Sequence, residues 1–321
     1  MVGKEFADSI DPGLYAATPP VEAMRVVLSR VATIQQDERK KVVMTNDVRR
    51  AYFHASVSRE VYVEIPSEDK NENDGDVVGR LNLCLYGPRD AAHRWQETVS
   101  EHLEQIGFRR GVAHPTVFHR EERDVATLAH GDDYMSSGFI EDMRWLKAEL
   151  SKRFEIKTQI VGHDGDCARE GNILNRVVRA TDMGFEMEAD PRHGELIVEA
   201  LNLKETKRVA TAGVDEPEDE NDETLTGQDV FTYGSLAARE KDLAIDRPDL
   251  MFACKELCRN MSTPTQQAWR RLIRLGKYLK NHPRVVWHYH WQEPVKDLVM
   301  HSDVNCAGCH ATRNPRQAAS Q

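Results

Sequence analysis

Periodic runs of apolar residues divide the first 160 residues into a regular series of helices and strands. Met24, Val27, Leu28 and Val31 recur at helical spacing, whereas residues 61–65 alternate between apolar and polar positions as a strand does. The pattern predicts, in chain order, helix 21–31, strand 41–47 ending in a carboxylate, strand 61–65, loop 67–76, strand 81–85, helix 90–106, strands 116–119, 125–130 and 133–137, helix 140–154 and strand 155–160.

The order of these elements predicts the fold class. From residue 41 the main elements follow as strand, helix, strand, strand, helix, strand. This is the split βαβ arrangement of a ferredoxin-like layer, in which helices cover one face of an antiparallel sheet. The sequence therefore predicts an α+β protein.

Beyond residue 160 the pattern changes to short strands and then to amphipathic helices. It predicts a hairpin of residues 172–179 and 184–188, helices 191–203, 250–261 and 266–279, and strands 285–291 and 298–301. Residues 215–223 read DEPEDENDE. This run has no apolar surface to bury and is expected to be a flexible linker.

Acidic residues are concentrated in that segment. The 321-residue chain has a formal net charge of −10, which argues against simple nucleic-acid binding because phosphate contacts need Lys and Arg. Residues 215–223 hold seven acids, so without them the charge is −10 + 7, or −3, an ordinary value for a globular protein. The basic clusters Arg49-Arg50, Arg109-Arg110 and 270–280 are either solvated faces or phosphate contacts.

The length predicts about two domains. The chain has no run of ~20 apolar residues, which a membrane span requires, and its first residues lack the apolar core of a signal peptide. Its six cysteines are scattered, which fits a reduced protein better than a disulfide framework. We therefore expect an intracellular, cytoplasmic protein without a membrane partner.

Adjacent aspartates, Asp132 and Asp133, are the main chemical signal. Like charges this close repel each other unless a cation lies beside them, and hard carboxylates suit Mg²⁺. Asp47 ends a strand of the same predicted sheet and supplies a third carboxylate, so two metal ions could be held for phosphoryl transfer. The alternative is that the aspartates simply close a β-turn. In either case a type II′ turn predicts positive φ at Gly131.

Several segments occur in an order that is typical of one family. They are NDVRRAYFHASVSREVYVEIP (46–66), LCLYGPRDAAHRW (83–95), GFRRGVAHPTVF (107–118), AHGDDYMSSG (129–138) and RPDLMFACKELCRNMSTPTQQAWRRLIRLGKYLKNHP (247–283). They resemble DVKTAFLNG…EEIYMEQP, LKKSLYGLKQAPRQW, GFKRSDADPCLY, YVDDMLIAG and TRPDI…SRFM…PTxxHWxAxKRILRYL of copia-type LTR retrotransposon Pol polyproteins. The resemblance is to the reverse transcriptase region.

This resemblance implies that Asp47, Asp132 and Asp133 are the catalytic, metal-binding aspartates. Tyr52 matches the position of an aromatic side chain that blocks the ribose 2′-hydroxyl and so selects deoxynucleotides. The implied cofactor is Mg²⁺, as two ions, with Mn²⁺ as a substitute.

Further residues are implied to bind the nucleotide. Arg89 matches a basic residue of the family's YGLKQ stretch, and Arg49 is placed to reach the triphosphate. Asp90 replaces the family's Gln, and an added negative charge near the nucleotide is expected to weaken binding. HSDVNCAGC (301–309) resembles the opening of the ribonuclease H domain, with Asp303 as its first acid. No Asp or Glu follows Asp303, so we expect no ribonuclease H activity.

The resemblance thus implies an RNA-directed DNA polymerase, a nucleotidyltransferase with a palm, partial fingers and a connection-like region. Its partners would be deoxynucleoside triphosphates and an RNA or DNA template with primer, within a virus-like particle in an intact element. The expected segments are a reverse transcriptase core (1–210), an acidic linker (211–226), a helical connection region (227–294) and a truncated start of ribonuclease H (295–321).

Two other hypotheses stay open on the sequence. The chain could be an inactive retrotransposon remnant that keeps the fold and weak nucleic-acid binding. It could also be a non-enzymatic structural or interaction domain whose aspartates only close turns.

Overall fold

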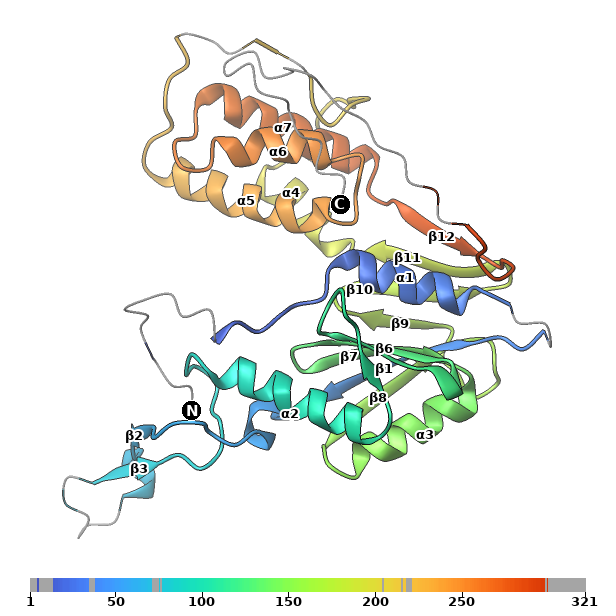
Figure 1. Ribbon diagram of the computed structural model, residues 1–321. Helices are drawn as coiled ribbons and strands as arrows, with labels where there is room; N and C mark the ends of the chain where they lie inside the picture. Colours follow the sequence, from blue (N-terminus) through green and yellow to red (C-terminus); the bar gives the residue numbers. More distant parts are fainter. Residues whose placement is uncertain are drawn as a thin grey trace. The chain divides into compact units, whose positions relative to one another are not determined.

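The computed structural model describes residues 5, 14–34, 38–70, 75, 77–203, 205–214, 216–217, 221–297 and 299. The chain divides into two compact units (Figure 1). The first contains Met1–Ile173, Arg179–Phe185 and Tyr289–Pro294, and the second contains Leu174–Val178, Glu186–His288 and Val295–Gln321. The expected segment 1–210 therefore extends over parts of both units.

The first unit is built on an antiparallel sheet with the strand order β4-β5-β6-β7-β1-β8. The strands are β1 (Val42–Val48), β4 (Arg109–Arg110), β5 (Val117–Arg120), β6 (Val125–His130), β7 (Asp133–Gly138) and β8 (Ile156–Val161). β1 pairs with β7 on one side and with β8 on the other, and β6 pairs with β7. This is the strand arrangement that the split βαβ pattern predicts.

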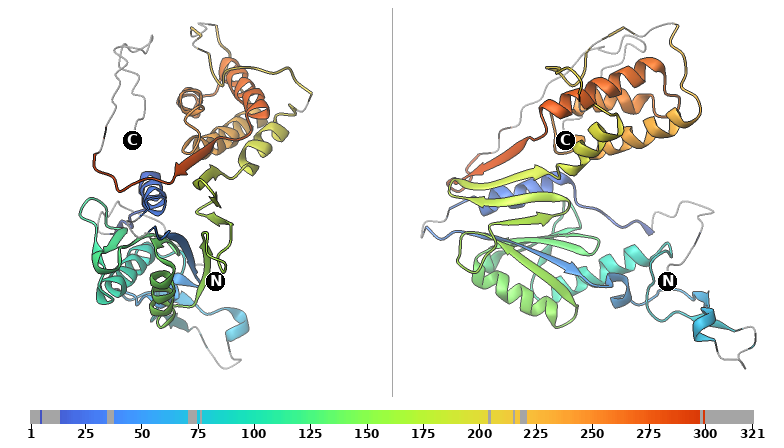
Figure 2. Two further views of the ribbon diagram at one scale, coloured as in Figure 1. Left: turned by 90° about the vertical axis from the view of Figure 1, so that its right-hand side faces the viewer. Right: turned by 180° about the vertical axis from the view of Figure 1, so that it is seen from behind.

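Helices cover both faces of this sheet. α2 (Ala91–Gln105) and α3 (Ile140–Ser151) lie on one face, and α1 (Val21–Val31) lies on the other (Figures 1 and 2). The expectation of helices on one face only is therefore wrong. α1 presents a buried apolar stripe that includes Leu28 and Val31, both 0% exposed, and full burial of such a side chain stabilises by about 1.5–3 kcal/mol.

The alternation of side chains along β1 assigns its residues to the two faces. Val42, Met44 and Val48 belong to the core that includes α2 and α3. Because successive strand residues point to opposite faces, Val43 and Asp47 point to the face of α1.

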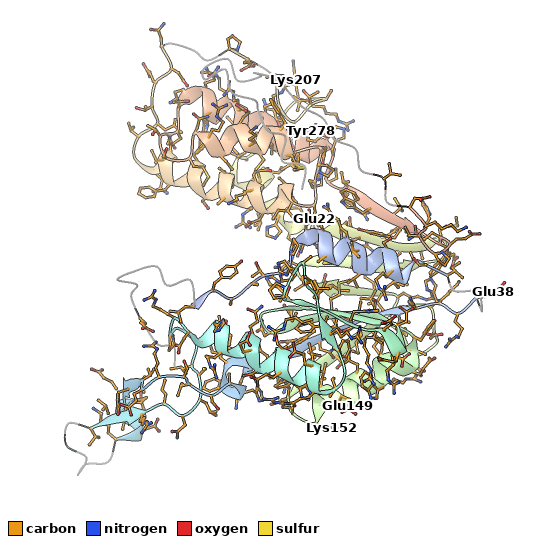
Figure 3. All side chains as sticks on the ribbon, viewed as in Figure 1. Glu22, Glu38, Glu149, Lys152, Lys207 and Tyr278 are labelled. Carbon is orange, nitrogen blue, oxygen red and sulfur yellow. The ribbon has the colours of Figure 1, made fainter. Side chains whose placement is uncertain are left out.

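The charged side of α3 faces away from the sheet, where Lys152 Nζ lies 2.7 Å from Glu149 Oε1 (Figure 3).

One predicted strand is misplaced. Instead of a strand at 81–85, the structure has β3 (Val78–Arg80) paired with β2 (Tyr62–Glu64). The apolar residues after Arg80 face a short 3₁₀ turn and bend rather than a strand, and the Cys84 amide donates to Ala55 O at 2.8 Å. The β-ladder of β2 and β3 cannot continue past Arg80, because the segment opposite residues 81–85 is not an extended strand.

A second sheet has the order β12-β11-β10-β9. Its strands are β9 (Glu170–Ile173), β10 (Arg176–Thr181), β11 (Gly184–Ala189) and β12 (Val286–His290). The predicted hairpin is found in part, as β10–β11, because the expected first arm 172–179 is broken by a turn at Leu174 (φ 49°) and Asn175 (φ 62°) between β9 and β10. The strand predicted at 285–291 is confirmed as β12. Of the strand predicted at 298–301, all but residue 299 lies outside the described residues.

The second unit is mainly helical. Its helices are α4 (Arg192–Ala200), α5 (Gln228–Ala244), α6 (Met251–Arg259) and α7 (Gln266–Asn281). α5 was not predicted as a helix, because Glu240 occupies a core-facing position between Tyr233 and Leu243 and interrupts the apolar pattern. None of the helices formed by described residues is long and apolar enough to cross a membrane.

The acidic segment is not simply a free linker. Asp222 Oδ1 accepts a hydrogen bond of 2.9 Å from the Gln267 amide, and Glu223 O accepts one of 2.8 Å from the Gln266 amide. Both amides belong to the first turn of α7, where the helix dipole favours a negative charge. Thr265 completes the cap through its Oγ1, 3.2 Å from the Ala268 amide. The expectation of a linker without contacts is wrong for these residues.

We expect Glu240 to make the folded protein less stable as pH rises. Both carboxylate oxygens are buried without a hydrogen-bond partner, and burial raises the pKa to about 8 from 4.5, although Arg247 acts to lower it. Above pH 4.5 the unfolded chain loses this proton while the folded chain keeps it. The contribution of Glu240 to stability is thus fully present below pH 4.5 and is lost as pH rises towards 8.

The variant Glu240→Gln should flatten this dependence, with a difference on the order of a few kcal/mol between acidic and mildly alkaline pH. Urea unfolding, followed by circular dichroism at about pH 5.5 and about pH 8.5, measures it. Asp242→Asn, which changes an exposed carboxylate on the same helix, should leave the pH dependence unchanged. Equal slopes for the wild type and Glu240→Gln would contradict the expectation.

Candidate active site

The register of β1 against β7 brings two of the predicted carboxylates together. Asp47 lies directly opposite Asp133 in the antiparallel ladder, and directly opposite residues have Cα atoms about 4.5–5.5 Å apart and side chains on the same face. Asp132 precedes Asp133 in the turn between β6 and β7. Like charges in opposite ladder positions destabilise a sheet, so this arrangement needs a compensating interaction.

The turn itself has the predicted form. His130 pairs with Asp133, which leaves Gly131 and Asp132 as the two loop residues. Gly131 has φ 63°, and Asp132 is not among the residues with positive φ. The prediction of positive φ at Gly131 is confirmed, and the signs of φ match a type II′ turn.

Groups outside the hairpin hold both carbonyls of this turn. Trp95 Nε1, from α2, donates to Gly131 O at 2.7 Å. The Val48 amide, which directly follows Asp47 in the chain, donates to Asp132 O at 2.9 Å. The aspartates are thus fixed with respect to both α2 and β1.

The electrostatics of Asp133 reflect this convergence. Its pKa is raised to about 6, first by burial and then by the negative charges of Asp132 and Asp47. Asp132 and Asp47 therefore both act on the ionisation of Asp133, and the role of the three aspartates as metal ligands stays a prediction. A cation beside them would offset the repulsion.

A hard divalent cation fits the chemistry of this donor set, because all three groups are carboxylates. Among the described residues, however, no group of three or more His, Cys, Asp or Glu side chains is arranged to hold a metal ion. The residue types fit Mg²⁺, and Asp47 and Asp133 share one face of the sheet, but the side chains do not form a complete set of ligands by themselves. Substrate phosphates and water commonly supply the remaining ligands of Mg²⁺.

Two tyrosines pack against each other near the aspartates, with their ring planes tilted by 35°. Tyr52 lies in the 3₁₀ turn Ala51–His54 that follows β1, after Arg50 in the left-handed conformation with φ 55°. Its ring centroid is 4.4 Å from that of Tyr86. Burial and then the charge of Asp132 raise the pKa values of both phenols. The role of Tyr52 in selecting deoxynucleotides stays a prediction. Tyr86 was not singled out, although it belongs to the quoted segment LCLYGPRDAAHRW.

Arg49 and Arg89, both predicted to bind the nucleotide, contact other residues of the chain, Arg49 through its guanidinium and Arg89 through its backbone amide. Arg49 Nη1 lies 2.5 Å from Glu155 Oε1, and both side chains are largely exposed, so this pair is weak and easily exchanged. The Arg89 amide donates to Glu5 Oε2 at 3.0 Å.

Asp90 is not a free charge. The residue is 3% exposed, Arg59 Nη2 lies 3.2 Å from Oδ1, and Ser58 Oγ donates to Oδ2 at 3.1 Å. Although burial acts to raise the pKa of Asp90, these hydrogen bonds lower it. Arg59 thus offsets part of the negative charge of Asp90, and the expected weakening of nucleotide binding stays a prediction. Asp303 lies outside the described residues.

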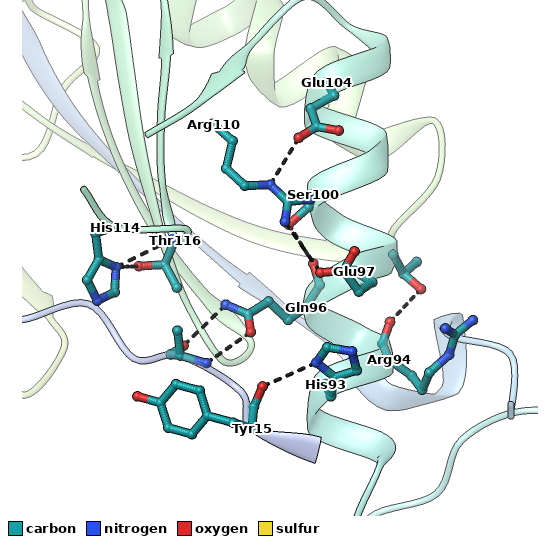
Figure 4. A network of polar contacts seen from close by, with 12 residues as sticks. Tyr15, His93, Arg94, Gln96, Glu97, Ser100, Glu104, Arg110, His114 and Thr116 are labelled. Atoms are coloured by element: carbon teal, nitrogen blue, oxygen red, sulfur yellow. Dashed lines mark hydrogen bonds and ion pairs between the residues drawn. The ribbon is translucent and has the colours of Figure 1, made fainter. Parts of the chain in front are cut away.

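A cavity of about 370 Å³ adjoins the turn, and Asp132 and Asp133 form part of its wall. Its other lining residues include Tyr52, Trp95 and Phe118. A chain segment closes it, because the Ala17 amide donates to Gln96 Oε1 at 3.0 Å, Gln96 Nε2 donates to Ala17 O at 3.4 Å, and His93 Nδ1 lies 3.2 Å from Tyr15 O (Figure 4). α2 therefore contacts both the turn that carries the aspartates and the chain segment that lines the cavity.

Comparisons with known proteins agree with this geometry. Residues 4–162 match the family model described as reverse transcriptase (RNA-dependent DNA polymerase). The chain is 24% identical over 286 residues to the retrovirus-related Pol polyprotein from transposon RE2 of Arabidopsis thaliana, covering 88% of this chain and 18% of the relative. It is 21% identical over 281 residues to that from transposon TNT 1-94 of Nicotiana tabacum, covering 83% and 20%.

These relatives are much longer proteins, and the chain spans about a fifth of their length. Among solved structures, a telomerase from Candida albicans in complex with a fragment of telomeric RNA is similar at 10% identity, with a TM-score of 0.34 over 85% of this chain and 49% of that chain. A similarity of this size supports no conclusion about binding.

The turn should need glycine at position 131 because of its positive φ, not because a side chain would collide with neighbouring atoms. An added Cβ at Gly131 would meet no atom within 4 Å, but φ 63° is costly for other residues. Gly131→Ala should lower the free energy of unfolding by roughly 1–2 kcal/mol, measured by chemical denaturation. Gly234→Ala in α5, where the space is also open, should instead stabilise by roughly 0.5–1 kcal/mol. Stabilisation by both variants would refute this account of the turn.

Proposed function

Residues 4–162 belong to the reverse transcriptase family found in copia-type Pol polyproteins, and on this premise we propose that the chain is an RNA-directed DNA polymerase. The reaction is nucleotidyl transfer from a deoxynucleoside triphosphate to the 3′ end of a primer on an RNA or DNA template. The observation that carries the proposal is the pairing of Asp47 with Asp133, with Asp132 beside them in the turn.

The three aspartates would hold two Mg²⁺ ions, which activate the primer hydroxyl and neutralise the leaving pyrophosphate. The chain contributes position and electrostatics. The Val48 amide and the Trp95 indole fix the turn, so the carboxylates need little rearrangement during the reaction. Preorganisation of this kind is a major source of catalysis. The raised pKa of Asp133 fits a site that becomes fully ionised when a cation binds.

In this proposal, the elements of the chain correspond to the subdomains of a polymerase. The sheet β6-β7-β1-β8 with α2 and α3 is the palm, and the hairpin β2–β3 belongs to partial fingers. α5, α6 and α7 form a connection-like region.

The nucleotide would bind beside Tyr52 and Tyr86. Their packed, tilted rings would offer an apolar wall against the sugar, with Tyr52 against its 2′ position. Arg49 would exchange its exposed partner Glu155 for the triphosphate, since exposed pairs of this type contribute little. Arg89 would add a second positive charge.

Primer extension tests the proposal. The wild type should extend a primer on an RNA template with Mg²⁺ or Mn²⁺, whereas Asp47→Asn or Asp132→Asn should lower the rate by about 10³-fold or more, because a site of few carboxylates loses a metal ligand. Calorimetry should show Mg²⁺ binding that Asp132→Asn removes. Asp166→Asn changes a carboxylate that is 84% exposed and should have no effect. No extension by the wild type with either metal would favour the inactive remnant.

Selection against ribonucleotides should depend on Tyr52. Tyr52→Val opens space at the sugar, so the ratio of kcat/KM for deoxynucleotide over ribonucleotide should fall by about 10-fold or more, which corresponds to about 1.4 kcal/mol. Single-nucleotide incorporation measures both values. Phe53→Val is the matched control, because Phe53 is the next residue and is 40% exposed. An unchanged ratio in Tyr52→Val would show that Tyr52 does not select against ribonucleotides.

A further inference from the structure

The indole of Trp95 contacts the catalytic turn at one particular atom. Trp95 is 1% exposed, and its Nε1 donates to Gly131 O at 2.7 Å. Gly131 is the first loop residue of the turn, and its carbonyl belongs to the peptide that joins it to Asp132. The hydrogen bond therefore fixes the orientation of the peptide that leads directly into a proposed metal ligand.

The turn has two alternatives that the local sequence allows. A type II′ turn has positive φ at its first loop residue, whereas a type I′ turn has positive φ at both. The two differ by a rotation of the central peptide. Glycine permits both, aspartate tolerates the left-handed region, and nothing lies within 4 Å of the position that a Cβ of Gly131 would occupy. The Gly-Asp sequence favours the type II′ form, but neither it nor the packing around Gly131 excludes the type I′ form.

The hydrogen bond from Trp95 selects the form that the structure has. Rotation of the central peptide would turn the Gly131 carbonyl away from α2, leave the buried indole N–H without this acceptor, and give Asp132 a positive φ. The indole cannot follow, because it packs edge-to-face on Phe154, with ring centroids 5.2 Å apart and an interplanar angle of 76°. An unmade bond at a buried donor is costly.

We propose that Trp95 is a positioning residue, which holds the turn in the form that directs the carboxylate of Asp132 towards the reacting atoms. The proposal rests on the proposed polymerase function for its consequence in catalysis. Its consequence for the turn, namely that Trp95 stabilises the type II′ form, is independent of any activity.

The chain offers a matched control at another hairpin. Trp291 Nε1 donates to Asp182 O at 2.9 Å, in the turn between β10 and β11. Trp95→Phe and Trp291→Phe thus each remove one hydrogen bond from an indole to a turn carbonyl, but only the first turn carries the proposed aspartates. If Trp95→Phe does not fold, benzothienylalanine at position 95 keeps the shape of the indole and replaces its N–H with sulfur.

Two measurements are made on the wild type and both variants. Amide hydrogen exchange of a peptide covering residues 129–135 should become about 10-fold faster in the Trp95 variant and stay unchanged in Trp291→Phe. In primer extension, kcat should fall by about 10-fold in the Trp95 variant with KM for nucleotide within about twofold, and the Mg²⁺ concentration for half-maximal rate should rise. Trp291→Phe should keep the wild-type kcat.

Unchanged exchange in the Trp95 variant, or an equal loss of kcat in both variants, would overturn the proposal. Failure of the polymerase function has a different signature. The wild type and Trp291→Phe would then be inert, while faster exchange at residues 129–135 in the Trp95 variant would still support the role of Trp95 in the turn.

Discussion

The repulsion between Asp47, Asp132 and Asp133 is the constraint on which the rest of the first unit depends. The antiparallel register places Asp47 opposite Asp133, an arrangement that a sheet would not adopt for its own stability. It persists because strong interactions around it fix the backbone. β1 is the inner strand between β7 and β8, and α2 holds the turn through Trp95. The stable core thus maintains an unfavourable local charge arrangement that a cation can relieve.

Two buried carboxylates outside the aspartate turn show how hydrogen-bond partners change the pKa of a buried acid. Asp90 is buried but receives hydrogen bonds from Arg59 and Ser58, and its pKa is lowered. Glu240 is buried with no hydrogen-bond partner and has a raised pKa. Asp133 resembles Glu240 in the direction of its shift, but its causes include two neighbouring acids. At Asp133 burial coincides with two neighbouring acids, whereas Glu240 has one neighbouring acid, Asp249, and a nearby Arg247 that acts to lower its pKa. Perturbed carboxylates of the first kind are typical of functional sites.

α2 connects the hydrophobic core, the aspartate turn and the cavity of the first unit. Its buried face contributes Trp95 and Leu103 to the core, and the same helix fixes the catalytic turn and, through Gln96, the segment that closes the cavity. The cavity, the turn and the helix therefore form one packed unit. A change in the position of α2 would alter the aspartates and the cover of the cavity together.

The sequence by itself determined the elements and the chemistry of the site. Helical and alternating periods are local, so they located α1, α2 and β6, and the motif order identified the family and its aspartates. The tertiary structure decided what depends on distant partners. Residues 81–85 look like a strand but meet no strand, and Asp90 looks like a free charge but meets Arg59. The hydrogen bond from Trp95 to Gly131 joins residues 36 positions apart. No periodicity along the chain records such a contact, because its energy arises only after the helix has packed against the sheet.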